Sequence, residues 1–217
     1  MSRTYVVPDL HGRYDLMEKA LERIEVGSPS GGTVVFLGDY IDRGRQSRQV
    51  IERLLAGPPE RWTWVTLKGN HEDMMVSCCD GPDIGWWLNN GGAETLESYG
   101  GKLPVDHIAW AAKLPMLHTD KHRVYVHAGV EPNRPLDAQG EAVLLWMRYP
   151  PNAIDIAYPG LHIVHGHTPQ KRGPELYHGR TNLDTGAVFY GRLVVGVFDD
   201  DKPGGPVSLI EITGQPS

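Results

Sequence analysis

Five clusters of polar residues each follow a short run of apolar residues, and many of their side chains are of types that bind metal ions. In open α/β sheets, ligands gather at the carboxyl ends of the strands, which is where such clusters would lie. Any one residue alone is explained as a turn, cap or strand-end residue, but five such clusters together favour a common site. Their metal-capable residues are Asp9, His11, Asp39, Asp42, Asn70, His71, His127, His165 and His167.

The ligand types indicate which metals would suit this site. Carboxylates, imidazoles and an amide oxygen, without thiolates, suit Mn, Fe or Zn, and the chain has no cysteine-rich zinc pattern. Asp39 can bridge two ions through its two oxygens, and Asn70 adds a neutral oxygen. Two ions about 3.5–4 Å apart can hold a bridging hydroxide and clamp a phosphoryl oxygen. The sequence therefore predicts a phosphoester hydrolase with two adjacent divalent ions, for which we expect Mn²⁺, with Fe or Zn as alternatives.

The remaining residues of the clusters fit the other needs of phosphoester hydrolysis. Arg43 offers a planar fork that matches phosphate oxygens, although a surface arginine or an ion pair with Asp42 would also explain it. His71 follows Asn70 directly, so it is placed to protonate the departing alkoxide. Asp42 would orient His71 and favour its charged form. The predicted acid is therefore His71, supported by Asp42.

Two types of pattern position these clusters along the chain. In the first half, apolar runs at residues 5–7, 33–37 and 64–67 each lead through a polar loop into a helical pattern. Such a strand–loop–helix series predicts an α/β fold with parallel strands. In the second half, we expect strands at residues 124–126, 163–164, 193–198 and 207–212, which suggests a second, largely antiparallel sheet. The stretch from Asp80 to Lys113 is interpreted as a helical or irregular cap.

The five clusters, in this order and spacing, resemble the motif set of the phosphoprotein phosphatases, within the calcineurin-like metallophosphoesterases. The quoted segments are Asp9-Leu10-His11-Gly12, Gly38-Asp39-Tyr40-Ile41-Asp42-Arg43-Gly44, Gly69-Asn70-His71-Glu72, His127-Ala128-Gly129 and Gly166-His167-Thr168. Residues 86–99 and 182–187 also look like the bacterial branch of the serine/threonine phosphatases. The resemblance implies an α/β fold in which two mixed β-sheets form a sandwich flanked by α-helices, with the two-metal site at one edge.

The resemblance also implies a role for each matching residue. Asp9 and His11 would bind the first metal and Asp39 would bridge the two. The second metal would be completed by Asn70, His127 and His167. His71 and Asp42 would be the catalytic acid pair, and Arg43 and Arg148 would bind the substrate phosphate. For His165 we expect strand packing or support of the ligands instead of metal binding, because the pattern matches only Gly166-His167.

Composition limits the alternatives. The 217 residues predict a single domain, residues 1–217, with an ordinary globular composition. A formal charge of −6 argues against broad nucleic-acid binding, and the sequence has neither a membrane-spanning run nor a signal-peptide pattern. We therefore expect a cytoplasmic protein that does not bind membranes. Cys78 and Cys79 are interpreted as buried thiols, with a vicinal redox pair as the alternative.

The leading hypothesis for function is a phosphatase that acts on phosphoserine, phosphothreonine or phosphotyrosine in proteins or peptides. A dinucleoside tetraphosphate hydrolase is the main alternative, although that group typically lacks the aspartate that matches Asp42. A nuclease is disfavoured by the net charge, and an inactive metal-binding scaffold is disfavoured because no ligand is missing. Trp86 and Trp87 are interpreted as core residues or as an apolar wall beside the metals.

Overall fold

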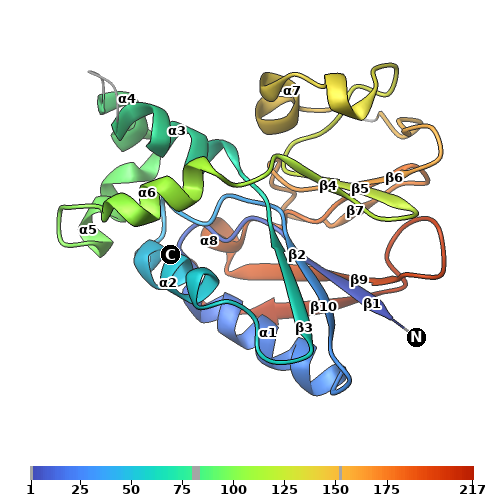
Figure 1. The fold of residues 1–217 in the computed structure, drawn as a ribbon, viewed down its shortest axis with the longest axis horizontal. Coiled ribbons are helices and arrows are strands. Elements are labelled where there is room, and N and C mark those ends of the chain that lie inside the picture. The colour runs from blue at the N-terminus through green and yellow to red at the C-terminus, as the bar shows by residue number, and fades with distance from the viewer. Residues whose placement is uncertain (1, 80–83, 152) are drawn as a thin grey trace.

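The first strand, β1 (Arg3–Val7), buries both of its faces, because successive side chains of a strand point in opposite directions. Tyr5 and Val7 pack toward helices, whereas Val6 packs toward a second sheet. The computed structural model, which describes residues 2–79, 84–151 and 153–217, thus contains two stacked sheets flanked by helices (Figure 1). This arrangement confirms the predicted fold class.

The first sheet has the order β10-β9-β1-β2-β3. Its central strands run parallel, β1 beside β2 and β2 beside β3, whereas β9 and β10 are antiparallel. The predicted parallel arrangement of the first half is therefore confirmed. The bounds of the other strands are β2 (Gly32–Phe36), β3 (Trp62–Thr66), β9 (Arg192–Asp199) and β10 (Ser208–Thr213).

The second sheet has the order β4-β5-β6-β8-β7. Its strands are β4 (Leu117–Thr119), β5 (Arg123–Val126), β6 (His162–His165), β7 (Glu175–Leu176) and β8 (Arg180–Asn182). The prediction of a largely antiparallel second sheet is wrong, because β5, β6 and β8 are parallel and only the edge strands are antiparallel. The C-terminal hairpin instead extends the first sheet, where Leu193, Val195 and Val197 join the core beneath the helices.

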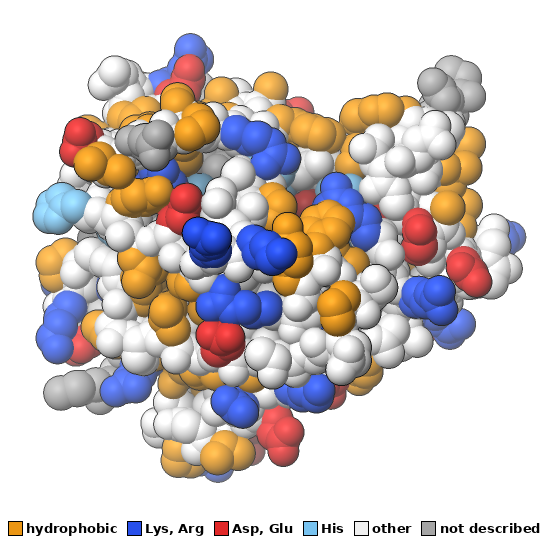
Figure 2. Space-filling model, turned by 180° about the vertical axis from the view of Figure 1, so that it is seen from behind, with side chains coloured by type: hydrophobic (Ala, Val, Ile, Leu, Met, Phe, Trp, Pro, Cys, Tyr) orange, Lys and Arg blue, Asp and Glu red, His pale blue; other side chains and the backbone are white. Residues whose placement is uncertain are grey.

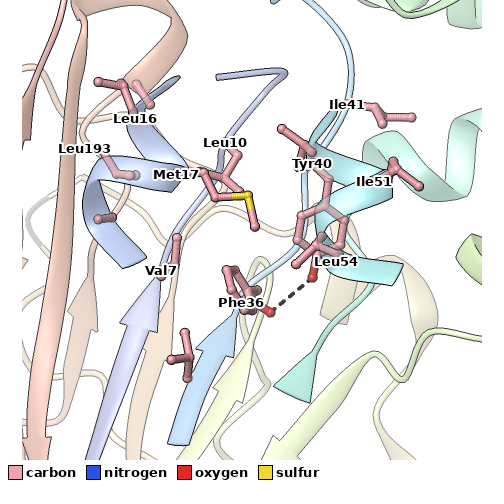
Figure 3. Close-up of a cluster of buried hydrophobic side chains, with 14 of the residues drawn as sticks. Val7, Leu10, Leu16, Met17, Phe36, Tyr40, Ile41, Ile51, Leu54 and Leu193 are labelled. Carbon is pink, nitrogen blue, oxygen red and sulfur yellow. Dashed lines mark hydrogen bonds between the residues drawn. The ribbon is translucent and has the colours of Figure 1, made fainter. Parts of the chain in front are cut away.

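Three hydrophobic clusters hold these layers together. The cluster between the two sheets includes Val6, Val35, Tyr125 and Val164. A larger cluster fills the space between the first sheet and its helices, where the Tyr40 hydroxyl donates to the carbonyl of Phe36 (Figure 3). The same hydroxyl also donates to the carbonyl of Leu67. The third lies on the other face of the second sheet, against helix α7. Both sheets are thus held rigidly beside the edge at which their polar loops meet.

The helices flank the sheets as the strand–loop–helix pattern predicts. Helices α1 and α2 cover one face of the first sheet, whereas α3 to α6 lie beside its end (Figure 1). The part of the predicted cap that is described is helical, and residues 80–83 lie outside the described residues. The bounds are α1 (Tyr14–Gly27), α2 (Ser47–Ala56), α3 (Asn70–Cys79), α4 (Gly85–Trp87), the π-helical turn η1 (Leu88–Gly92), α5 (Ala93–Ser98), α6 (Val105–Ala112), the 3₁₀ turn η2 (Leu136–Ala138), α7 (Glu141–Trp146) and α8 (Ala187–Tyr190).

Charge and thiols add two smaller observations. Lys and Arg side chains gather beside hydrophobic ones near the middle of the face shown in Figure 2, despite the net charge of −6. Cys78 is buried and Cys79 is half-buried. Among the described residues, no helix has the length and apolar character needed to span a bilayer.

Candidate metal centre

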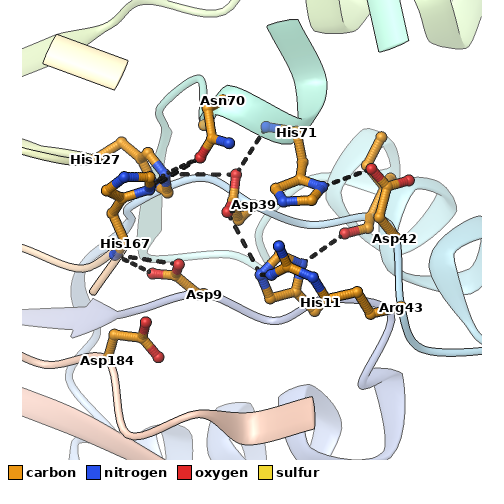
Figure 4. A network of polar contacts seen from close by, with 12 residues as sticks. Asp9, His11, Asp39, Asp42, Arg43, Asn70, His71, His127, His167 and Asp184 are labelled. Atoms are coloured by element: carbon orange, nitrogen blue, oxygen red, sulfur yellow. Dashed lines mark hydrogen bonds and ion pairs between the residues drawn. The ribbon is translucent and has the colours of Figure 1, made fainter. Parts of the chain in front are cut away.

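The ends of five strands bring the predicted site residues together at one edge of the sandwich. The loop after β1 carries Asp9 and His11, and the loop after β2 carries Asp39, Asp42 and Arg43. A loop of three residues after β3 leads into α3, which begins with Asn70 and His71. His127 follows β5, and His167 follows β6. Ten labelled side chains of this edge surround one centre in Figure 4: Asp9, His11, Asp39, Asp42, Arg43, Asn70, His71, His127, His167 and Asp184.

The backbone at these loops is strained in a way that aims the side chains inward. His11, Asp39, Asp42, Arg43 and His167 all have left-handed φ angles, of 45°, 52°, 73°, 69° and 65°. A non-glycine residue in this region costs about 1–3 kcal/mol, and such strain clusters at functional sites. Of the six non-glycine residues with such angles in the described part of the chain, these five are predicted site residues and the sixth is Arg61. Most of this strain therefore lies where it directs the side chains of the site.

Two motif glycines let the loops approach one another closely. A Cβ on Gly166 would lie 2.1 Å from Oδ1 of Asp9, and one on Gly69 would lie 2.2 Å from Oδ1 of Asp39. Both contacts are with buried carboxylates that have little room to move. A side chain at either position would therefore displace a predicted metal ligand.

Two groups of potential ligand atoms share one aspartate. The first group is His11, Asp39 and His71, and the second is Asp39, His127 and His167. Asn70 adds its Oδ1 to the second group, 2.9 Å from Nε2 of His127 and 3.0 Å from Nδ1 of His167. Asp39 thus has the position that a bridging ligand needs.

Asp9 lies beside the two ligand groups and holds the backbone of His167, which belongs to the second group. Its two carboxylate oxygens accept hydrogen bonds from the backbone N–H of His167, at 3.0 and 3.1 Å. The side chain is buried. This contact links the loop after β1 with the loop after β6, and therefore links the two sheets at the site.

The tautomers of two histidines test whether a cation fits. Nδ1 of His127 donates to the carbonyl of Leu37 at 3.0 Å, so its Nε2 is a lone pair that faces Oδ1 of Asn70 and, at 3.5 Å, Oδ1 of Asp39. Nδ1 of His11 likewise donates to the carbonyl of Ile41, which leaves its Nε2 lone pair 3.4 Å from Oδ2 of Asp39. Arg43 donates to Nε2 of His11, but the acceptors that converge around Asp39 and Asn70 still favour a cation among them. The buried Nε2 of His167 also has no hydrogen-bond partner among the described residues, so the donor set fits divalent metals.

Burial shifts the ionisation of the same side chains toward their uncharged forms. It raises the pKa of Asp39 to about 7 and raises the pKa of Asp9 well above its ordinary value. It lowers the pKa of His127 to about 4 and also lowers that of His11. A divalent cation favours ionised carboxylates and neutral imidazoles. It would therefore lower the raised pKa values of the two aspartates and keep the two histidines neutral.

His71 and Asp42 form a buried pair next to these groups. Nδ1 of His71 lies 2.6 Å from Oδ2 of Asp42, which requires a proton between the two atoms. Burial raises the pKa of Asp42 to about 7 and lowers that of His71. Nε2 of His71 faces the centre, 3.9 Å from Oδ2 of Asp39, so geometry alone allows either a proton donor or a further ligand there.

Asp42 is held by two residues that the sequence interpretation did not assign to the site. Thr95 donates its hydroxyl to Oδ1 of Asp42 at 2.7 Å and accepts the Asp42 backbone N–H at 2.8 Å. The indole N–H of Trp87 donates to both carboxylate oxygens, at 3.1 and 2.9 Å. Trp87 is fully buried, so the suggestion that it forms an apolar wall beside the metals is wrong. A buried indole needs a hydrogen-bond acceptor, and here Asp42 is that acceptor.

Glu72 and Asp184 were also missed as functional residues. The buried carboxylate of Glu72 accepts the backbone N–H groups of Asp39, Tyr40 and Gly69 at 2.8–2.9 Å, which ties two of the loops together. Burial raises the pKa of Asp184 well above its ordinary value, and the nearby charge of Asp9 raises it further. Both residues lie in segments that resemble the family motifs, so the sequence could have indicated that they matter. It could not show which hydrogen-bond donors or charges they face.

The two arginines lie on the walls of the central pocket. Arg43 hydrogen-bonds to Nε2 of His11, and its guanidinium lies 5.5 Å from the ring centre of Phe189. Arg148 donates through one nitrogen to the carbonyl of His167 and to the Thr168 hydroxyl, both at 3.1 Å. The pocket has a volume of about 220 Å³ and is lined by His11, Asp39, Arg43, Asn70, His71, Met74, Asn90, Trp146, Arg148, His167, Pro169, Asp184, Gly186 and Phe189.

His165 lies outside this pocket, in keeping with its expected packing role. Its Nδ1 donates to the carbonyl of Gly166, and its Nε2 accepts from Arg180 at 3.2 Å. Its ring meets Tyr149 edge-on. Burial lowers the pKa of His165 to about 3, so the imidazole is neutral and acts as an acceptor for Arg180.

Comparisons with known proteins agree with this site. Residues 2–196 match the family model described as calcineurin-like phosphoesterase. Serine/threonine-protein phosphatase 2 of Escherichia coli is 38% identical over 89 residues, which are 41% of this chain and 38% of that protein. A bis(5'-nucleosyl)-tetraphosphatase, PrpE of Halalkalibacterium halodurans, is 28% identical over 87% of both chains, and serine/threonine-protein phosphatase 1 of Salmonella typhimurium is 28% identical over 88% of this chain and 89% of its own.

Among solved structures, a cold-active protein-tyrosine phosphatase of a psychrophilic Shewanella species superimposes with a TM-score of 0.63. The identity is 18%, and the match covers 97% of this chain and 80% of that one. At this identity the match supports the fold alone. With the family model covering most of its length, the chain belongs to the calcineurin-like metallophosphoesterases and is a metal-dependent phosphoester hydrolase.

Proposed function

We propose that this protein is a two-metal phosphomonoesterase that removes phosphate from phosphorylated serine and threonine, and also tyrosine, in proteins or peptides. The observation that carries the proposal is a single pocket that holds a shared aspartate, Asp39, between two ligand groups and has two arginines on its walls. The adjacent pair of His71 and Asp42 supplies a group that can protonate a leaving oxygen.

The metals would be held by six side chains. Asp9 and His11 would bind one ion, Asp39 both, and the second ion would be completed by Asn70, His127 and His167. When bound, the ions would polarise the phosphoryl group and lower the pKa of the attacking water. We propose Mn²⁺, with Fe or Zn as alternatives, because the donors are carboxylate, imidazole and amide oxygen.

Arg43 and Arg148 would position the phosphoryl group between them. Both line the pocket, and a guanidinium matches phosphate oxygens in geometry as well as in charge. Arg148 uses Nη1 for His167 and Thr168, so its other two guanidinium nitrogens, Nη2 and Nε, remain for substrate. Their positive charge would also offset the buried carboxylates when a phosphate dianion enters.

His71 would donate a proton to the departing oxygen through Nε2. Its Nδ1 is fixed on Asp42, and Asp42 is fixed by Thr95 and Trp87, so the ring has one orientation. A negatively charged Asp42 stabilises the protonated imidazole, which counteracts the effect of burial. A serine or threonine alkoxide is a poor leaving group, so these substrates need the proton most.

Cleavage of dinucleoside tetraphosphates is the second candidate, because a relative that matches over most of the chain is a bis(5'-nucleosyl)-tetraphosphatase. The buried, fully hydrogen-bonded Asp42 favours the monoesterase, since a terminal-phosphate leaving group needs less help from a protonated histidine. The pocket of about 220 Å³ is also smaller than the roughly 300–1,000 Å³ of sites for drug-sized ligands.

A substrate panel tests the proposal. The purified protein, loaded with Mn²⁺, would be assayed on phosphopeptides and on diadenosine tetraphosphate at matched pH, with phosphate and nucleotide products both measured. We expect a higher kcat/KM for a phosphopeptide and a loss of activity on chelation. If dinucleotide cleavage were tenfold faster, a difference of about 1.4 kcal/mol in transition-state free energy, the protein phosphatase assignment would be wrong.

A further inference from the structure

One wall of the pocket is formed by an exposed aromatic ring that contacts two neighbouring rings. Trp146, at the end of α7, lines the pocket and is 37% exposed. Its ring stacks on Trp86, with 5.8 Å between ring centres and 26° between planes, and meets His167 edge-on at 6.4 Å. Trp86 is 49% exposed and does not line the pocket, so it supports Trp146 from behind.

A second aromatic ring belongs to another wall. Phe189, in α8, lines the same pocket, is 46% exposed and lies under the guanidinium of Arg43. Exposed apolar side chains are not unusual in themselves, but those that line a pocket together offer an apolar surface to a ligand bound there. The pocket thus combines phosphate-binding arginines with two aromatic rings that come from segments about 40 residues apart in the sequence.

We propose that Trp146 and Phe189 bind the ring of an aromatic leaving group, so that among phosphomonoesters this enzyme is selective for phosphotyrosine and other aryl phosphates. The inference rests on the proposed phosphomonoesterase function, and it concerns the preference of that same site. In an aryl phosphate the ring is attached directly to the phosphoryl oxygen. A phosphate held between Arg43 and Arg148 therefore places such a ring next to the two aromatic side chains.

The size of the pocket favours this ligand over a nucleobase. A volume of about 220 Å³ suits one ring with its phosphate, whereas a base of a dinucleotide is separated from the cleaved phosphoryl group by a ribose and further phosphates. Met74 is the remaining large apolar side chain of the lining, and its flexible thioether packs well against aromatic rings. A serine or threonine leaving group would leave these apolar surfaces uncovered.

Binding of two phosphonates separates ring recognition from leaving-group chemistry. Phenylphosphonate and methylphosphonate cannot be hydrolysed, so the ratio of their inhibition constants for the Mn²⁺-loaded protein reports only the contribution of the ring. We expect phenylphosphonate to bind about tenfold more tightly, the order expected for burial of an aromatic ring against aromatic partners. Trp146→Leu and Phe189→Leu should each bring this ratio toward one. A ratio near one in the unaltered protein would overturn the proposal.

Turnover provides the second measurement. Two peptides of identical sequence, one with phosphotyrosine and one with phosphoserine, would be compared in each variant. We expect Trp146→Leu and Phe189→Leu to raise KM about tenfold more for the phosphotyrosine peptide than for the phosphoserine peptide. Tyr190→Leu is the matched control, because Tyr190 is 42% exposed next to Phe189 but does not line the pocket, and it should preserve the phosphonate ratio.

The outcomes distinguish the two proposals. Equal losses on both peptides in Trp146→Leu would mean that this residue acts through His167, and would overturn the selectivity proposal. Hydrolysis of the phosphoserine peptide with no discrimination between the phosphonates would contradict selectivity and leave the monoesterase function intact. Failure to release phosphate from either peptide, together with rapid cleavage of diadenosine tetraphosphate, would contradict the proposed function itself.

Discussion

The floor and the rim of the pocket are built differently. We call the buried layer beneath the pocket its floor. Its member that lines the pocket is His71, which is joined to Asp42, and Asp42 is joined to Trp87 and Thr95, by hydrogen bonds of 2.6–3.1 Å. Glu72, also buried, accepts backbone N–H groups of the adjacent loops. The rim consists of Trp86, Trp146, Phe189 and Arg148, which are partly exposed and held mainly by ring contacts and single hydrogen bonds.

This difference teaches where reaction and selectivity reside. Buried polar networks are costly when one member loses its partner, so the floor tolerates little change and defines the chemistry. Exposed aromatic residues have few hydrogen-bond partners to lose, so a substitution at the rim can change which substrate binds without disturbing the reacting groups. Floor variants should therefore change kcat for every substrate, whereas rim variants should change mainly KM, and variants of the aromatic rim residues should do so differently for each substrate.

The largest effect should come from the bridging position. In Asp39→Ala, both metal groups lose a ligand, so we expect loss of both ions and activity reduced to that of chelated protein. In His127→Ala, only the second group loses a ligand, so one ion should remain. Elemental analysis of the two variants gives the metal content per chain. Equal loss of metal in both would contradict the assignment of Asp39 as a bridge.

The next largest effect is expected at the proposed proton donor. His71→Asn should lower kcat by roughly 10²–10⁴-fold while the metals are retained. The loss should be smaller for a nitrophenyl phosphate than for a phosphoserine peptide, because its leaving group needs less protonation. Loss of a metal ion in this variant would indicate that Nε2 of His71 is a ligand, and a uniform loss across leaving groups would indicate a positioning role.

Trp87 tests how far the floor extends from the reacting atoms. Trp87→Phe keeps an apolar ring but removes the donor to Asp42, so we expect a fall in kcat of about 10–100-fold, the range for residues that orient a functional side chain. The pH profile of kcat should shift as well, since Asp42 loses a hydrogen bond that lowers its pKa. Trp110→Phe, in the same helical region but outside this network, serves as the control.

At the rim, Arg148→Ala should act mainly on substrate binding. We expect KM to rise about tenfold or more, because hydrogen bonds to charged groups are worth about 1.5–3 kcal/mol, with a smaller change in kcat. The ratio between phosphotyrosine and phosphoserine peptides should stay constant, in contrast to Trp146→Leu. Steady-state kinetics on the two peptides measures this ratio, and a changed ratio would contradict the prediction.

The smallest effect concerns the stability of the metal-free protein. The pKa values of Asp39, about 7, and Glu72, about 8, are raised above their unfolded values, so the native state binds more protons and loses stability as pH rises to about 8. Histidines with lowered pKa, such as His127 and His165, have the opposite effect, but only below about pH 6.5.

A net loss of stability should therefore occur between pH 6.5 and 8, at about 1.4 kcal/mol per pH unit for each proton released. Thermal unfolding of chelated and Mn²⁺-loaded protein across this range measures it. The loaded protein should show little loss, because bound cations favour the ionised carboxylates. Parallel curves for the two forms would mean that the raised pKa values are unrelated to metal binding.

Much of the metal centre was predictable because each of its residues lies next to the end of an apolar strand. Asp9, Asp39, Asn70, His127 and His167 follow runs whose pattern already identifies them as strands, and the ends of parallel strands meet at one edge. Local order along the chain was therefore enough to predict the parallel strands of the first half and the meeting of these side chains at one edge. The two mixed sheets were implied by the family resemblance, because the strand pattern alone predicted a largely antiparallel second sheet. The types of side chain were enough to predict the metal chemistry.

Other features depend on contacts between distant segments, which only the tertiary structure decides. Trp87 lies 45 residues from the aspartate that it holds, and its neighbour Trp86, of the same type, is exposed. The C-terminal hairpin joins the first sheet because its alternate apolar residues fit beneath α1. The sequence of its turn does not determine which of the two sheets it pairs with. Trp146 and Phe189 line one pocket because α7 and α8 lie at the same edge. The proposed selectivity would therefore be a property of packing and not of any local motif.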